Sequence, residues 1–298
     1  MKKIAVLLSA YNGYEYIEEQ IDSIYGQTYK EIELYVRDDG SENAFVEKLR
    51  SLREQYGFFL IEGTNVGFVQ SFMELLKTVE NADLYAFADQ DDIWLSDKLE
   101  RAANWFEDAE NNSIPLLFHG AYDIIDSSTR EKKGKFYFSE NGYDFRLSIT
   151  ENHYSGFSMV INKSLRMMII KGNPQKVGYH DWWAAMIVKA FGKAYSDEHV
   201  TALHRTHGDN ITTFNIKTRF RWFIRSITEE SDIHKRCVEF NRCFGKYLSS
   251  GNKSILDMFC NDRYNFFVAV KKAFCIRRWR PQFSSEMVIR FLMLIGRI

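Results

Sequence analysis

The chain has 298 residues, of which 45% are hydrophobic and 27% charged, and it contains only three prolines. These proportions are those of an ordinary globular protein and exclude a disordered, collagen-like or fibrous chain. No apolar run approaches the roughly 18 residues of a membrane span, and the run at residues 4–8 is too short for a signal peptide, so we expect a cytoplasmic protein.

The net charge of −1 hides two regions of opposite charge. Residues 215–298 carry 17 Lys and Arg against 7 Asp and Glu, whereas residues 1–214 carry 22 against 33. We therefore predict two parts, a body over 1–214 and a basic, aromatic-rich helical region over 215–298. Basic residues interleaved with Phe and Trp are typical of helices at an anionic membrane surface. Packing on the body with solvated basic faces stays open, and the acidic body argues against a nucleic-acid partner.

Strands and helices alternate from the N-terminus. Apolar patterning predicts strands at 4–8, 32–36, 58–61, 84–88 and 116–118, and helices at 17–24, 45–56, 68–79 and 94–106. Such alternation implies right-handed crossovers and an α/β fold, with a mostly parallel, Rossmann-like sheet flanked by helices. In these sheets ligands bind beyond the carboxyl ends of the strands, and each polar cluster described below follows a predicted strand or begins a helix.

The pattern changes in the second half of the body. From about Ser127 to Asn152, charged and aromatic residues show no clear period, which indicates an insertion or a lid. Regular patterning then returns and predicts a strand at 157–161, a helix at 181–191 and an extended segment at 194–203.

Three acids within four residues follow the strand predicted at 84–88. They are Asp89, Asp91 and Asp92, with Gln90 between them. Carboxylates this close repel one another unless a cation or hydrogen-bond donors offset their charge. Oxygen ligands suit Mg²⁺ or Mn²⁺, so we predict a divalent metal site. An acidic cap on the following helix is the alternative, although a cap needs only one acid.

Two further acidic clusters lie at the ends of predicted elements. Asp38 and Asp39 close the second strand, where a carboxylate can accept the ring N–H of a pyrimidine; a turn with a helix cap is the alternative. Asp181, between His180 and Trp182, begins a predicted helix beside indole rings. Such surroundings can raise a carboxyl pKa and suit a general base toward a sugar hydroxyl. The alternative there is an ordinary cap beside core tryptophans.

Several common catalytic motifs are absent: G-x-G-x-x-G, G-x-x-x-x-G-K-[ST], H-E-x-x-H and G-x-S-x-G. Dinucleotide, P-loop, zincin and hydrolase-elbow sites therefore lack their main support. His204 and His207 lie three residues apart, which alone is weak evidence for a metal site. Beside an acidic cluster, His207 becomes a candidate to complete the metal coordination or to contact a diphosphate.

Over roughly residues 1–210 these motifs resemble glycosyltransferase family 2, the inverting nucleotide-sugar transferases with a GT-A fold. The segments that match the family, in its order and spacing, are Ser9-Ala10-Tyr11-Asn12-Gly13, Gln27-Thr28-Tyr29, Asp38-Asp39-Gly40-Ser41, Asn65-Val66-Gly67 and Asp89-Gln90-Asp91. In that order they resemble the first nucleotide loop, the lead-in to the second strand, the base-contacting turn, the donor-side loop and the D-x-D metal motif.

The resemblance implies a role for each matching residue. Asp91 becomes the principal metal ligand, Asp89 a ribose or metal contact, and Asp181 the catalytic base. Asp38 and Asp39 become nucleotide contacts. The remaining donor-binding candidates are Ser9, Ala10, Tyr11, Asn12, Asn65, Gly67, Gln90 and Trp182. The implied reaction is a single displacement in which the anomeric configuration inverts.

Residues 89–94, 98–99, 180–183 and 205–210 further resemble bacterial rhamnosyltransferases of polysaccharide assembly, which typically use dTDP-L-rhamnose. The resemblance implies transfer of L-rhamnose to a glycan or lipid-linked acceptor in cell-surface polysaccharide synthesis. The basic, aromatic-rich residues after 215 lead us to expect a cytoplasmic enzyme that is peripheral on the inner face of the cell membrane. Arg37 departs from the family's usual apolar residue, and the region after 215 matches no motif. A UDP-glucose, UDP-galactose or UDP-N-acetylglucosamine donor stays open, as does a non-catalytic sugar-nucleotide or lipid-binding module.

Overall fold

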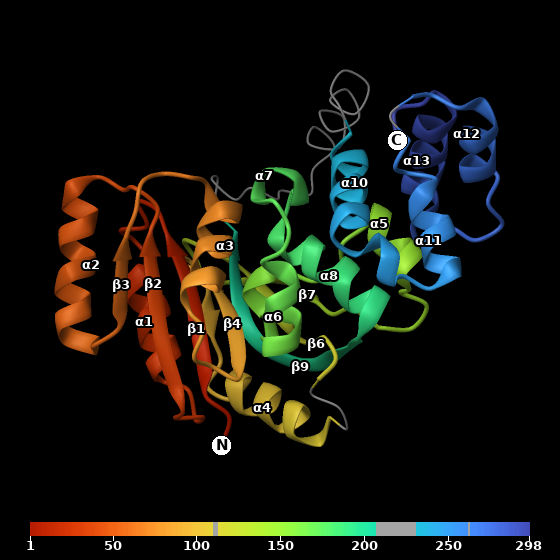
Figure 1. Cartoon of the computed structure of the whole chain (residues 1–298). Helices are drawn as coiled ribbons and strands as arrows, with labels where there is room; N and C mark the ends of the chain where they lie inside the picture. Colours follow the sequence, from red (N-terminus) through yellow and green to blue (C-terminus); the bar gives the residue numbers. More distant parts are fainter. Residues whose placement is uncertain (110–112, 207–230, 262) are drawn as a thin grey trace.

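The computed structural model describes residues 1–109, 113–206, 231–261 and 263–298 (Figure 1). Within them, nine strands form one sheet in the order β3-β2-β1-β4-β8-β6-β9-β5, with β7 paired to β6. The strands are β1 (Ile4–Ala10), β2 (Ile32–Asp38), β3 (Phe59–Glu62), β4 (Leu84–Asp89), β5 (Ile93–Trp94), β6 (Leu116–Asp126), β7 (Lys132–Phe136), β8 (Met159–Asn162) and β9 (Lys193–Thr206).

The sheet is parallel in its N-terminal half and mixed beyond it. Strands β1 to β4 pair in parallel, and β8 lies antiparallel to both β4 and β6. The long pairing of β6 with β9 is parallel again, while β7 and β5 add antiparallel edges. The predicted α/β fold, a sheet flanked by helices with its first strands in parallel, is therefore confirmed, and the antiparallel strands make the sheet mixed.

Alternation along β1 divides the helices between the two faces of the sheet. Val6 and Leu8 pack in one apolar cluster with α1 (Ile17–Tyr25), α2 (Asn43–Tyr56) and α4 (Lys98–Asp108). Ala5 and Leu7 pack in the other with α3 (Phe68–Thr78), α6 (Lys163–Ile169) and α8 (His180–Phe191). Successive residues of a strand point to opposite faces, so β1 is buried on both sides, as its apolar run predicts.

One expectation about local structure was wrong. Ser9 and Ala10, expected in a loop, are the last residues of β1, because their backbones pair with Arg37 and Asp38 of β2. The segment 127–152, expected to be an insertion or a lid, contains β7 and α5 (Phe145–Thr150). Its α5 part belongs to the core, because the side chains of Phe145 and Ile149 are buried there.

The described part of the C-terminal region is helical, as expected. It contains α10 (Asp232–Phe244), α11 (Ser250–Asp257), α12 (Phe266–Ala273) and α13 (Phe283–Leu294), and the short α7 (Pro174–Val177) lies beside α10 (Figure 1). Phe240 packs edge-on against Trp183 of α8, with ring centroids 5.3 Å apart. None of the described helices combines the length and the apolar character that a bilayer span requires.

Candidate active site

Strands β1, β2 and β4 end at one edge of the sheet. Ala10 pairs with Asp38, and Ser9 pairs with Asp89. The parallel register therefore brings two acids that are far apart in sequence to neighbouring positions beyond the strand ends, where α/β sheets bind their ligands. The sequence predicts this juxtaposition.

The Asp38 and Asp39 carboxylates are buried and hold two turns. Asp38 accepts hydrogen bonds from the backbone N–H groups of Gly40 (3.1 Å) and Ser41 (3.2 Å). Asp39 accepts bonds from the N–H groups of Val66 (3.0 Å) and Gly67 (2.9 Å), which fixes the loop before α3.

Gly40 allows these two turns to meet. Its φ of +75° lies in the left-handed region, and a Cβ there would lie 2.4 Å from the backbone nitrogen of Asn65. The segments containing Asp38 and Asn65 are therefore in contact, as a shared nucleotide site would require.

Arg37 explains why a charged residue ends this apolar strand. Its buried guanidinium pairs with Asp39 (2.5 Å) and Glu74 (2.8 Å) and donates to Ser71 (3.1 Å). The cation offsets the cost of burying the Asp39 carboxylate. Arg37, which departs from the family's usual apolar residue, therefore has a structural role, and a lone arginine before two acids is a sequence signal for such a pair.

Gln90 fastens the first loop to the acidic turn. Its side-chain amide accepts from the Tyr11 N–H (2.8 Å) and donates to the Tyr11 carbonyl (3.1 Å). Asn12 joins the same loop to the second turn, because its N–H donates to Ser41 Oγ and its Oδ1 accepts from the Glu42 N–H. The loops after β1, β2 and β4 thus form one connected rim.

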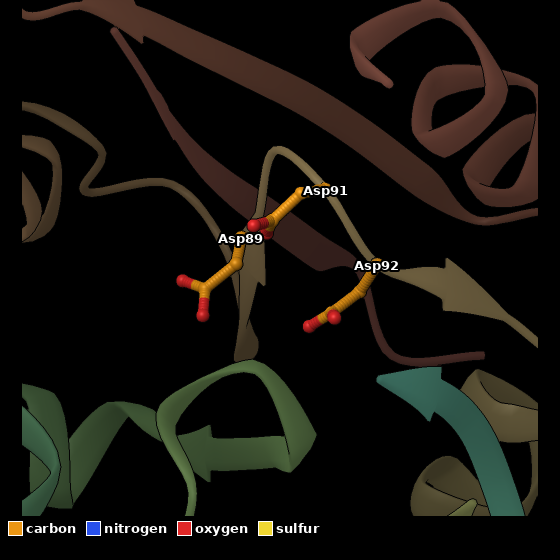
Figure 2. A group of neighbouring side chains, drawn as sticks. All are labelled: Asp89, Asp91 and Asp92. Atoms are coloured by element: carbon orange, nitrogen blue, oxygen red, sulfur yellow. The ribbon is translucent and has the colours of Figure 1, made fainter. Parts of the chain in front are cut away.

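The three acids after β4 gather as predicted (Figure 2). Asp89, Asp91 and Asp92 each offer a carboxylate oxygen, and these oxygens lie within 4.8 Å of one another. Burial raises the pKa of Asp89 well above its usual range, and the charges of Asp92 and Asp91 raise it further. A bound cation would relieve this repulsion.

A histidine on β9 reaches the acidic cluster. His204 Nδ1 lies 2.8 Å from Asp92 Oδ1, and the imidazole stacks on Phe157 at 4.8 Å between centroids. Burial alone would lower the pKa of His204, but the Asp92 bond and the other carboxylates raise it to about 9. His207, the histidine singled out from sequence, lies outside the described residues. The antiparallel register of β5 with β9 places His204 here, and sequence spacing alone does not reveal that register.

Asp181 lies in the first turn of α8, close enough for its negative charge to act on the acidic cluster. Its charge is among those that raise the pKa of Asp89. Burial raises the pKa of Asp181 to about 6, although a 2.6 Å bond from the Trp182 N–H and the charge of Arg236 oppose the rise. A carboxylate with this pKa is ionised at neutral pH and still accepts a proton readily.

Trp182 is held between the body and α10. Its indole N–H donates to the Ser148 carbonyl (2.6 Å), and the Arg236 guanidinium carbon lies 3.7 Å from its ring centroid. Arg236 is 1% exposed, and its Nε and Nη2 atoms have no hydrogen-bond partner. No sequence signal identified Arg236, because only the tertiary fold brings α10 to α8.

The sequence is similar to those of known glycosyltransferases. The family model described as "Glycosyl transferase family 2" matches residues 5–170, more than half of the chain. A curated relative, the dTDP-rhamnosyl transferase RfbG of Shigella flexneri, is 25% identical over 74% of this chain and 82% of its own length. An uncharacterized glycosyltransferase of Nostoc, alr2836, is 29% identical over 43% of this chain and 39% of its own length.

Solved structures show the same fold. TarS of S. aureus, residues 1–349, superposes with a TM-score of 0.58 at 15% identity, over 99% of this chain and 81% of its own. The mannosyltransferase PcManGT of Pyrobaculum calidifontis, in complex with GDP-Man and Mn²⁺, gives 0.52 at 16% identity, over 92% and 70%. These similarities confirm the GT-A-like sheet with its C-terminal helices, and the family match shows that the chain is a member of glycosyl transferase family 2.

Proposed function

We propose that the protein is an inverting, metal-dependent rhamnosyltransferase that moves L-rhamnose from dTDP-L-rhamnose to a glycan or lipid-linked acceptor in bacterial cell-surface polysaccharide synthesis. The observation that carries the chemistry is Asp181, a carboxylate at the start of α8 whose charge acts on the acidic cluster after β4. The similarity to the RfbG dTDP-rhamnosyl transferase supports the choice of donor.

The acidic cluster suits a hard divalent cation. Asp89 and Asp91 offer oxygens within reach of a common ion, and Asp92 Oδ2 is buried with no hydrogen-bond partner. A buried carboxylate oxygen without a partner lowers folding stability unless a ligand binds to it. Mn²⁺ or Mg²⁺ bound there would stabilise the charge of the departing diphosphate. We assign Asp91 and Asp89 as ligands, we add Asp92 Oδ2 as a proposed ligand, and we retain His207 as a proposed further contact.

The rim beyond β1, β2 and β4 would receive the nucleotide. We assign the base and ribose to Asp38 and to the first loop, which contains Ser9, Ala10, Tyr11 and Asn12. Asp39 holds the Asn65–Gly67 loop through its two backbone bonds, so we expect it to act on the donor through that loop. Gln90 and Trp182 would border the sugar.

Asp181 would then act as the general base. Its ionised carboxylate takes the proton of an acceptor hydroxyl, whose oxygen attacks the anomeric carbon on the side opposite the departing diphosphate. One C–O bond forms as the other breaks, so the configuration inverts. A positioned base contributes typically 10²–10⁴-fold in rate, which makes Asp181 necessary for useful turnover.

We further propose that the enzyme works at the inner face of the cell membrane. A lipid-linked acceptor is confined to that surface, and the C-terminal region is rich in Lys and Arg.

Asp181→Asn tests the proposal together with a panel of donors. We expect Mn²⁺-dependent thermal shifts with dTDP-L-rhamnose in both wild type and variant, because a ligand that binds the folded state stabilises it. Only wild type should release dTDP in the presence of acceptor. A shift with UDP-glucose, UDP-galactose or UDP-N-acetylglucosamine instead would keep the chemistry and change the product. Full turnover by Asp181→Asn would refute the base, and no shift with any donor would favour a non-catalytic binding module.

A further inference from the structure

The outer face of α13 carries a stripe of exposed apolar side chains. Phe283, Met287, Phe291 and Ile295 follow one another at intervals of four residues and are 66%, 52%, 49% and 43% exposed. Residues four apart lie on one face of a helix. The opposite face, with Ile289 and Leu292, is buried, so α13 is apolar on both sides although only one side is covered.

Helix α12 and its connection to α13 also carry exposed apolar side chains. Phe267 and Phe274 are 82% and 71% exposed, and Ile276 in the connection is fully exposed. The two helices pack against each other and form a hairpin at the end of the molecule opposite α2 (Figure 1). Apolar side chains gathered in this number on one hairpin mark an interaction surface.

The charge around these side chains is strongly positive. Residues 263–298 contain eight Lys and Arg and one acid, Glu286, which is buried and paired with Arg290. Lys271, Arg278 and Arg297 are exposed and form no ion pair with any described residue. A cavity of about 520 Å³ lies beside the hairpin, and its lining includes Arg263 and Arg297.

We propose that the α12–α13 hairpin is the surface through which the protein docks on an anionic lipid bilayer. The apolar stripe on α13 enters the headgroup region, while the basic side chains contact lipid phosphates. This role rests on the proposed function, in which the acceptor is lipid-linked. The hairpin would bring the active site to the membrane surface where that acceptor lies. A second copy of the chain is disfavoured, because a symmetric contact would bring two strongly positive surfaces together.

The test is co-sedimentation of the full chain with phosphatidylcholine vesicles, with and without about one-third phosphatidylglycerol. We expect wild type to bind only the anionic vesicles. Phe291→Ser should weaken binding roughly tenfold, because it removes one exposed aromatic ring that would enter the headgroup region. Lys271→Gln should weaken it roughly fivefold, because it removes one surface charge.

Phe59→Ser is the matched control, because Phe59 is 51% exposed, much like Phe291, and belongs to β3, which lies at the other end of the molecule (Figure 1). It should bind vesicles as wild type does. The Mn²⁺-dependent donor shift should persist in Phe291→Ser and Lys271→Gln, so loss of vesicle binding is separated from loss of the donor site. Wild-type binding by Phe291→Ser would overturn the proposal, as would a solution dimer that Phe291→Ser dissociates.

Discussion

The ionised form of Asp181, which we propose as the catalytic base, lowers the stability of the folded protein. Its pKa of about 6 in the folded protein exceeds the usual value of 3.8. The folded state therefore binds a proton more tightly than the unfolded chain, and stability falls as pH rises through this window. The difference of roughly two pH units corresponds to about 3 kcal/mol at neutral pH. Burial that tunes a base in this way reduces stability in exchange for activity.

The same residue predicts a pH profile. With Asp181 as base, kcat/KM should fall below about pH 6 as its carboxylate is protonated. Arg236→Met removes a cation that favours the charged carboxylate, so the acidic limb should move to higher pH. The loss of two unpartnered buried donors favours the folded state, whereas the ionised Asp181 loses a cation, so any loss of folding stability should be smaller below about pH 6 than above it. Lys246→Met removes an exposed charge that does not act on Asp181 and should leave the profile unchanged; an unmoved profile in Arg236→Met would contradict its role.

At the scale of elements, the sequence predicts where the central strands end, but it does not predict which distant side chains contact the site. Apolar runs locate β1, β2 and β4, and parallel pairing then brings Asp38 and Asp89 together, so most of the candidate site follows from one strand pattern. The short β5 and the helix α5 lack a readable period, because few residues carry their pattern. The contacts of Arg37, His204 and Arg236 depend on register and on distant helices, which local sequence does not encode.

Arg37→Leu tests whether the Arg37–Asp39 ion pair stabilises the end of β2 and the loop before α3. The buried Asp39 carboxylate would lose its cation while staying enclosed, so we expect a loss of about 3–5 kcal/mol in the free energy of unfolding. The donor-dependent thermal shift should also shrink, because the loop before α3 loosens. Arg50→Leu breaks two exposed ion pairs and should cost less than about 1 kcal/mol by urea denaturation. Equal losses in both variants would contradict the account.

Across the whole molecule, one apolar cluster joins the sheet to the C-terminal helices. Phe240 and Phe244 of α10, Phe259 after α11 and Trp279 after α12 are buried together with Trp183 of α8. The division at residue 214, expected from charge, remains a prediction about function. The packing indicates that the body relies on these helices to cover one side of its core.

Truncation at residue 214 tests that dependence. Without α10 to α13, the rings of Trp183 and Phe145 face solvent, so we expect a chain that binds a hydrophobic dye and lacks a cooperative thermal transition. Circular dichroism melts of the truncated and full chains make the comparison. A sharp transition at the full-length midpoint would show that residues 1–214 fold on their own.

The shared cluster also fixes when the fold can be completed during synthesis. Ala5 and Ile298 belong to the same buried group, so this core can close only after residues 1–298, α13 included, have left the ribosome. At about 5–20 residues per second, translating the stretch from Asp232 onward takes several seconds, during which the face of α8 stays uncovered. Contacts between such distant parts of a chain form slowly. A nascent-chain chaperone should therefore engage this protein while residues 232–298 are being made.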